Sequence, residues 1–257
     1  APLSLSFLFY LWLADDVRKN FLTGYMYGLG MFGFGVFWLR ISIDQFGNVG
    51  TLFAISITLC FIFFLALFPA FAGFLAARYG PHAPVKRLLL FMPAVWVGIE
   101  WVRHWLFTGF PWLTIGYGQI DNLLGSYAPV GGVLFVSYAT TLIAAAIVLL
   151  MFHFRARMTA LLTICGIVVG GLFFARMDWN EPAGEAFRVS LVQGNVDQVD
   201  KWKSEMRQPT LDLYANLTRM NWDSRLVVWP ETAVPAFYHS LRNKFLAPIA
   251  REARENG

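Results

Sequence analysis

A glutamate that follows a short apolar run is the residue of this 257-residue chain best suited to acid–base chemistry. The run Val227-Val228-Trp229 is typical of a buried parallel strand, and Pro230 cannot extend a strand ladder. Glu231 comes directly after this proline, and the working groups of open α/β sheets gather at the carboxyl ends of strands. We expect the adjacent tryptophan and proline to desolvate the carboxylate, as suits a general base. A plain turn carboxylate is the alternative.

A second strand exit precedes this glutamate in the sequence. Residues 192–195, with sequence VQGN, read as the end of a strand followed by a Gly-Asn turn. Lys201 and Trp202 come next, and Glu231 lies 29 residues after Trp202. Alone, the first segment is only a common turn. The two segments together predict one site in an α/β domain.

Two charges inside an apolar run form a third candidate. Glu100 and Arg103 are three residues apart, so they can meet on one face of a helix. Charged residues within a membrane span are costly and are usually paired or functional. Two interpretations therefore stay open: the side chains pair with each other, or they contact the headgroup of a substrate. The aromatic residues that follow, Trp112 among them, are typical of a membrane–water interface.

Composition indicates a protein that crosses a membrane several times. The chain is 57% apolar and only 14% charged, with a net charge of +4, which excludes an ordinary globular domain and a disordered chain. Five apolar runs are long enough to cross about 30 Å of hydrocarbon: 21–40, 49–76, 88–107, 123–150 and 158–176. A sixth run, at 3–13, is too short to span a membrane, and we expect it to be the end of a longer helix that was clipped.

The polar gaps between these runs alternate in charge. Lys and Arg occur in the gaps at 15–20, 77–87 and 152–157, and they are absent from the gaps at 42–50 and 108–122. Positively charged loops mark the cytoplasmic side of a membrane. This pattern places the two uncharged gaps, and everything after residue 176, on the outer side.

The segment after residue 176 has a different character. Strands are predicted at 187–193 and 225–229, and helices at 209–220 and 241–255, an order typical of an α/β domain. We therefore expect a transmembrane helical domain over 1–177 and part of an α/β domain over 178–257. The sequence stops where another strand is expected, so the second domain is interpreted as truncated.

Several classes of site are not predicted. The chain contains no Walker or HExxH motif, and its four histidines are scattered without ligand spacing. No metal and no cofactor are therefore expected. No block of Lys and Arg suggests nucleic acid as a partner.

Taken together, the motifs resemble those of the apolipoprotein N-acyltransferases, bacterial inner-membrane enzymes that add the third acyl chain to lipoproteins. The resemblance covers nearly the whole chain and includes VQGN, Lys201-Trp202 and Trp229-Pro230-Glu231. WPE alone specifies only the nitrilase (carbon–nitrogen hydrolase) superfamily, whereas FTGFPW is highly specific to the family. The membrane half matches at 27–35, at 107–113 (FTGFPWL) and at 116–121 (GYGQID).

The resemblance implies a fold of eight transmembrane helices with a periplasmic nitrilase-like αββα domain between the last two. This chain would hold about six of the helices, the first one clipped, and the N-terminal part of the catalytic domain. Glu231 matches the base of a Glu-Lys-Cys triad, whose Lys and Cys should lie beyond Gly257, so the fragment itself is expected to be inactive. Trp202 matches a tryptophan needed for activity. Substrate-binding or supporting roles are expected for Glu100, Arg103 and Trp112.

The resemblance also implies the reaction and its partners. An acyl chain would move from a phospholipid, typically phosphatidylethanolamine, through a Cys thioester to the α-amine of a diacylglyceryl-cysteine apolipoprotein. The protein is expected to be a monomer in the inner membrane with its catalytic domain in the periplasm. The alternatives are a membrane-tethered nitrilase-type amidase, or a non-enzymatic polytopic scaffold or transporter.

Overall fold

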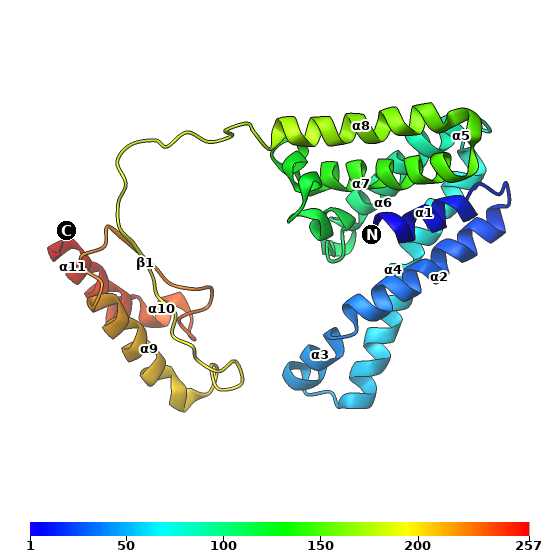
Figure 1. Ribbon diagram of the computed structural model, residues 1–257. Helices are drawn as coiled ribbons and strands as arrows, with labels where there is room; N and C mark the ends of the chain where they lie inside the picture. Colours follow the sequence, from blue (N-terminus) through cyan, green and yellow to red (C-terminus); the bar gives the residue numbers. More distant parts are fainter. Residues whose placement is uncertain (257) are drawn as a thin grey trace. The chain divides into compact units, whose positions relative to one another are not determined.

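The computed structural model describes residues 1–256 and divides the chain into two compact units. The first, here called the helical unit, is Ala1–Asn180, and the second, here called the mixed unit, begins at Glu181. The boundary expected from composition, at residue 177, lies three residues earlier. Figure 1 shows the elements of each unit, which are described separately.

The helical unit consists of helices joined by short turns. Its long apolar stretches can satisfy their backbone hydrogen bonds in hydrocarbon only by forming helices. Its elements, in chain order, are α1 Pro2–Leu11, α2 Val17–Val36, α3 Leu39–Gly47, α4 Thr51–Tyr79, α5 Pro84–Lys86, η1 Arg87–Phe91, α6 Met92–Arg103, η2 Leu106–Thr108, η3 Ile115–Gln119, η4 Leu123–Tyr127, α7 Ala128–Phe152, η5 Phe154–Ala156 and α8 Arg157–Phe174.

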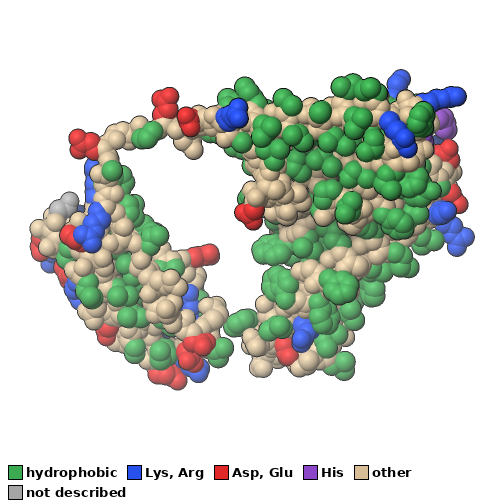
Figure 2. All heavy atoms as spheres, viewed as in Figure 1, with side chains coloured by type: hydrophobic (Ala, Val, Ile, Leu, Met, Phe, Trp, Pro, Cys, Tyr) green, Lys and Arg blue, Asp and Glu red, His purple; other side chains and the backbone are tan. Residues whose placement is uncertain are grey.

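The outer faces of these helices are apolar as well as their core. Phe34 of α2 is 95% exposed and Leu52 of α4 is 82% exposed. Figure 2 shows hydrophobic side chains over the sides of the helical unit. Apolar surface of this extent is expected where helices face lipid rather than water.

Within residues 1–256, three helical stretches are long and apolar enough to cross a membrane: Thr51–Tyr79, Leu123–Phe152 and Phe154–Phe174. A fourth span is obtained if α2 and α3, which meet at a bend of 51°, are counted as one. The sequence predicted five spans. The prediction of a helical membrane domain is thus confirmed, but the predicted number of uninterrupted spans is not.

The missing span is the one predicted at 88–107. The chain is helical there, but a wide π turn, η1, precedes α6, and α6 ends at Arg103. Pro93 lies in the first turn of α6 and has no N–H to offer the preceding turn, which accounts for the irregular backbone. The prediction of one continuous helix over 88–107 is therefore wrong, because residues 104–107 already belong to the following loop.

Helices α2 and α4 approach each other closely through small residues. A side chain on Gly24 would lie 2.4 Å from the carbonyl oxygen of Pro69, and one on Gly28 would lie 2.8 Å from the Cα atom of Ala66. Small residues spaced four apart let membrane helices pack backbone against backbone. This contact fixes the pair of helices that carries α3 (Figure 1).

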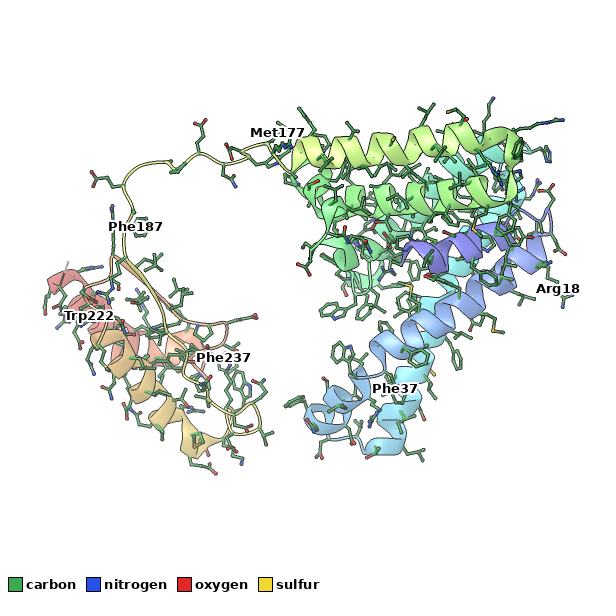
Figure 3. The ribbon with its side chains drawn as sticks, in the orientation of Figure 1. Arg18, Phe37, Met177, Phe187, Trp222 and Phe237 are labelled. Atoms are coloured by element: carbon green, nitrogen blue, oxygen red, sulfur yellow. The ribbon has the colours of Figure 1, made fainter. Side chains whose placement is uncertain are left out.

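The three turns rich in Lys and Arg lie at one end of the helical unit. Arg87 forms an ion pair with Asp15, and the Tyr10 ring stacks on the Phe152 ring with centroids 4.2 Å apart. These contacts join the segments at 10–20, 77–87 and 152–157, which contain the Lys and Arg residues of the three charged gaps. Figure 3 labels Arg18 at this end, and Figure 2 shows Lys and Arg side chains gathered there. We call it the basic end.

The remaining turns share the opposite end. The rings of Trp38 and Trp112 lie 6.3 Å apart, and the Ser126 hydroxyl donates to the carbonyl oxygen of Gly171 at 2.8 Å. Figure 3 labels Met177 at this end, beyond the last turn of α8. The charge alternation read from the sequence therefore corresponds to two physical ends of the helical unit.

The mixed unit contains a parallel strand–helix–strand arrangement. Its strands pair through Val189 with Leu226, Ser190 with Val227 and Leu191 with Val228. The helix α9 connects them, so the order strand, helix, strand, helix agrees with the sequence prediction. The elements are β1 Val189–Leu191, α9 Ser204–Arg219, β2 Leu226–Val228, α10 Tyr238–Leu241, η6 Arg242–Leu246 and α11 Ala247–Glu255.

Candidate functional site

The ends of β1 and β2 form one edge of the mixed unit. Because the strands are parallel, their carboxyl ends lie together, and the Val192 N–H donates to the carbonyl oxygen of Val228 at 2.9 Å. Asn195 and Thr232, which follow the two strands, both have left-handed backbones with φ of 49° and 52°. The backbone therefore turns sharply after each of the two strands, and Glu231 lies in the turn after β2.

A direct contact joins two of the predicted motifs. The Lys201 ammonium donates a hydrogen bond to the Thr232 hydroxyl at 2.8 Å. Lys201 precedes Trp202, and Thr232 follows Glu231. The structure therefore brings the KW and WPE segments together at the strand ends, with the Trp202 side chain 61% exposed.

Trp229 packs away from this edge, against α9. Its Nε1 donates to the Thr218 hydroxyl at 2.8 Å, and its ring lies 5.6 Å from that of Tyr214 and 6.1 Å from that of Phe245. Glu231 is exposed. The expectation that Trp229 desolvates this carboxylate is therefore wrong for the described residues. The strand ends at Val228, and the turn that follows separates the two side chains.

In the helical unit, Glu100 and Arg103 are both buried, with 4% and 3% of their surface exposed. They form no ion pair with each other within 4.0 Å, so the predicted pairing is not observed. Glu100 Oε1 accepts the N–H of Ile115 at 2.9 Å instead. The two charges hold the loop that follows their helix.

Arg103 makes most of these loop contacts. Its Nη1 donates to the carbonyl oxygens of Phe110 and Trp112 at 2.5 Å each, and its Nη2 donates to the Thr114 hydroxyl at 3.3 Å. The guanidinium carbon also lies 5.4 Å from the ring centroid of Phe32 on α2. A planar guanidinium presents several donors in a fixed fork, which suits it to bind several oxygens at once.

The loop held in this way, residues 104–115, has an unusual backbone. Phe107, Thr108 and Leu113 have positive φ values of 51°, 74° and 59°. Gly109 has φ of 85°, and a side chain there would come within 1.9 Å of the His104 carbonyl oxygen. Residues in sparsely populated conformations persist only where the surroundings fix them, and they cluster at functional sites.

The loop presents aromatic side chains outward. The Trp112 ring stacks on Phe110 with centroids 5.3 Å apart and is 51% exposed. Together with Pro111, Leu113 and Tyr117 it lines a hollow of about 340 Å³. An open hollow of this composition can accept an apolar chain.

One further residue of this loop was missed by the sequence analysis. Thr114 is 1% exposed, and its hydroxyl lies 2.9 Å from Nε2 of His104 and donates to the Pro111 carbonyl oxygen at 2.7 Å. A lone threonine in a polar gap carries no sequence signal for such a role. Only the fold of the loop reveals it.

Comparison with known proteins identifies the family. Residues 1–146 match the model of the apolipoprotein N-acyltransferase N-terminal domain. The chain belongs to the apolipoprotein N-acyltransferase family. The matched region includes α6 and the loop held by Arg103, so these features belong to the family domain.

Curated relatives cover the mixed unit as well. An apolipoprotein N-acyltransferase of Methylococcus capsulatus is 46% identical over 258 residues, which is 100% of this chain and 51% of the relative. Those of Photobacterium profundum and Coxiella burnetii are 39% and 36% identical, covering all of this chain and 49% and 53% of the relatives. The chain thus spans about half the length of the curated relatives it matches.

Proposed function

We propose that this chain is part of an enzyme that moves an acyl chain from a membrane phospholipid to the α-amine of an apolipoprotein. The observation that carries the proposal is family membership over the whole chain, including 46% identity to a named apolipoprotein N-acyltransferase. The apolar helices of the helical unit support a protein that works within a membrane.

The proposed reaction has two half-steps. A cysteine thiolate attacks an ester carbonyl of the phospholipid, phosphatidylethanolamine in our proposal, the ester C–O bond breaks, and a lysophospholipid leaves. The amine of the diacylglyceryl-cysteine then attacks the thioester, a C–N bond forms, and the C–S bond breaks. Covalent catalysis of this kind divides one difficult step into two easier ones.

Glu231 is the proposed general base of both half-steps. It takes the thiol proton in the first and passes it to the leaving alkoxide, and it takes the amine proton in the second and returns it to the thiolate. Its place directly after β2, beside the turn that carries Trp202, supports this role. The lysine and cysteine of the triad are proposed to follow Gly257, with the lysine stabilising the oxyanion. Neither Cys60 nor Cys165 is proposed as the nucleophile, because both lie in the helical unit.

The loop held by Glu100 and Arg103 is proposed to support the lipid substrate. The two buried charges fix its backbone, and Trp112 with Tyr117 lines an apolar hollow suited to an acyl chain. The two charged side chains then act by positioning the loop, rather than by touching a headgroup.

We further propose that the mixed unit is the N-terminal part of a nitrilase-like αββα domain, because it contains a parallel strand–helix–strand arrangement. The proposed location is the bacterial inner membrane, with the basic end cytoplasmic and the mixed unit periplasmic. The proposed working state is a monomer.

Single-turnover acylation tests the proposal. A longer polypeptide that contains these residues and continues beyond Gly257 is incubated with phosphatidylethanolamine labelled in its acyl chain, and then with a diacylglyceryl-cysteine peptide. We expect a hydroxylamine-sensitive thioester that is consumed as N-acyl peptide forms. Release of free fatty acid without transfer would instead indicate an amidase-type hydrolase.

A further inference from the structure

The basic end of the helical unit contains a groove that the proposed reaction does not use. Its volume is about 540 Å³, and it lies between the start of α5 and the turn that joins α7 to α8. It is lined by Pro84, Val85, Phe152, His153, Phe154, Arg155, Ala156 and Thr159. Two segments almost 70 residues apart in the sequence thus form a single concave surface.

The charge of the groove is of one sign. Arg155 lines it, Lys86 follows Val85 in the chain, and no carboxylate is among the lining residues. Within residues 1–256, neither Arg155 nor Lys86 takes part in an ion pair. These cations are therefore available to a negatively charged ligand.

A further cation, Arg157, lies against the ring of Phe154, which lines the groove. Arg157 Nε donates to the carbonyl oxygen of Leu150 at 3.0 Å, and its guanidinium carbon lies 4.8 Å from the ring centroid of Phe154. These contacts hold the charge in place without neutralising it. A positive charge already held by the protein loses little conformational entropy when it binds an anion.

The surroundings indicate a ligand that is both charged and apolar. Phe152 and Phe154 line the groove and are 51% and 77% exposed, and the apolar faces of α7 and α8 begin directly beside them. Exposed aromatic rings next to basic residues are typical of the headgroup level of a membrane. A ligand bound here would place its charged group among the cations and its chains along the two helices.

We propose that this groove binds the phosphate of an anionic phospholipid in the leaflet that faces the basic end. Basic pockets between membrane helices recognise such headgroups. A general excess of Lys and Arg in cytoplasmic loops accounts for the charges alone, but it does not require a concave site beside exposed aromatic rings. The proposal is independent of the acyl transfer, because it involves only the helical unit and the end opposite Trp112.

The test uses the 257-residue chain in detergent and short-chain lipids. Dihexanoyl-phosphatidylglycerol, dihexanoyl-phosphatidylcholine and inorganic phosphate are titrated separately while the midpoint of thermal unfolding is recorded. We expect phosphatidylglycerol to raise the midpoint, because a ligand that binds only the folded state stabilises it. Phosphatidylcholine and inorganic phosphate should have much smaller effects.

Two double variants locate the site. Lys86→Gln with Arg155→Gln should weaken phosphatidylglycerol binding by about 30-fold, since each basic residue near an anionic lipid surface contributes about fivefold. The matched control removes the same charge at the opposite end, through Arg40→Gln and Arg176→Gln, and should retain the binding. Lys86→Gln alone, at an exposed side chain, serves if the double variant is poorly folded.

Three results would overturn the proposal. One is an equal shift with phosphatidylcholine, which would indicate a general effect of lipid. Another is an equal shift with inorganic phosphate, which would remove the lipid from the assignment. The third is equal loss of binding in the two double variants, which would mean that net charge alone attracts the lipid.

Discussion

Lys201 and Thr232 are 31 residues apart, and the ammonium of the first donates a hydrogen bond of 2.8 Å to the hydroxyl of the second. Lys201 directly precedes Trp202, and Thr232 directly follows Glu231, so each is adjacent to a residue of the proposed active site. The contact closes the space between two turns that leave neighbouring parallel strands. It supports one site at this edge, rather than two unrelated turns.

The first prediction concerns Glu231 in a longer protein that carries this chain. Glu231→Gln keeps the shape of the side chain and removes its ability to accept a proton. General-base contributions are about 10²–10⁴-fold, so thioester formation should fall by at least about 100-fold. Single-turnover acylation with a phospholipid donor measures it, with thermal stability recorded alongside.

Glu255→Gln is the matched control, because Glu255 is also exposed and lies at the end of α11. It should acylate at the parental rate. If Glu231→Gln did the same, Glu231 would be only a turn residue. Stability should be little changed in either variant, because both carboxylates are on the surface.

A second prediction concerns the 257-residue chain itself. With only Glu231 of the proposed triad present, it should form no thioester with a labelled phospholipid. Mass spectrometry after incubation measures the adduct. An acyl group on Cys60 or Cys165 that is passed on to a peptide amine would contradict the assignment of the nucleophile to residues after Gly257.

A third prediction concerns the loop after α6. Arg103→Lys keeps the charge but replaces a planar fork, which reaches Phe110, Trp112 and Thr114, by one ammonium. Hydrogen bonds to charged groups contribute about 1.5–3 kcal/mol each, so the helical unit should lose about 2 kcal/mol or more. Backbone amides of residues 107–115 should exchange with deuterium faster than in the parent.

The control for this change is Arg40→Lys. The guanidinium of Arg40 lies 5.2 Å from the Phe37 ring centroid. This substitution should leave exchange in residues 107–115 at the parental rate. Unchanged protection of the loop in Arg103→Lys would show that its backbone is held by other contacts.

A fourth prediction is a pH dependence in the mixed unit. Arg219 on α9 donates to both carboxylate oxygens of Glu252 on α11, at 2.8 and 2.9 Å. The hydrogen bond and the charge of Arg219 lower the pKa of Glu252 from its ordinary value of 4.5. A carboxylate with a depressed folded-state pKa stabilises the fold above its unfolded value, and this contribution disappears as the pH falls through the folded pKa.

Glu252→Gln should therefore lower the unfolding midpoint of the mixed unit at about pH 7, and the difference from the parent should vanish well below about pH 4.5. The effect is small because the pair is exposed to solvent. Arg219→Gln removes the same interaction, so the double variant should lose no more than either single one. A difference that persists at low pH would mean that the pair is not its origin.

The long helices were predictable because hydropathy alone determines them in a membrane protein. Predicted runs at 49–76, 123–150 and 158–176 correspond to α4, α7 and α8. The run at 88–107 was predicted to continue too far, because the helical stretch ends at Arg103 and residues 104–107 belong to the loop that follows. The short strands were found because continuous apolar runs flanked by turn residues have few other interpretations.

The contacts of the candidate site were less predictable. Helical spacing correctly placed Glu100 and Arg103 on one turn, but their partners are backbone groups of a loop with positive φ values, which no periodicity encodes. The exposure of Glu231 depends in the same way on the turn after β2. Local pattern thus identified the residues, and only tertiary structure identified what they contact.

The last prediction concerns orientation in the membrane. Lys86 lies at the basic end of the helical unit, and Asp197 lies in the mixed unit, which follows the opposite end of α8. The excess of Lys and Arg in three turns predicts that the basic end is cytoplasmic.

A cysteine at position 197 should then react with a membrane-impermeant maleimide in intact cells, and one at position 86 only after lysis. Each is introduced into a chain in which Cys60 and Cys165 are replaced by serine. Both side chains are exposed, so lack of reaction reports the membrane barrier rather than burial. Labelling at 86 but not at 197 in intact cells would reverse the topology, and with it the proposed periplasmic location of Glu231.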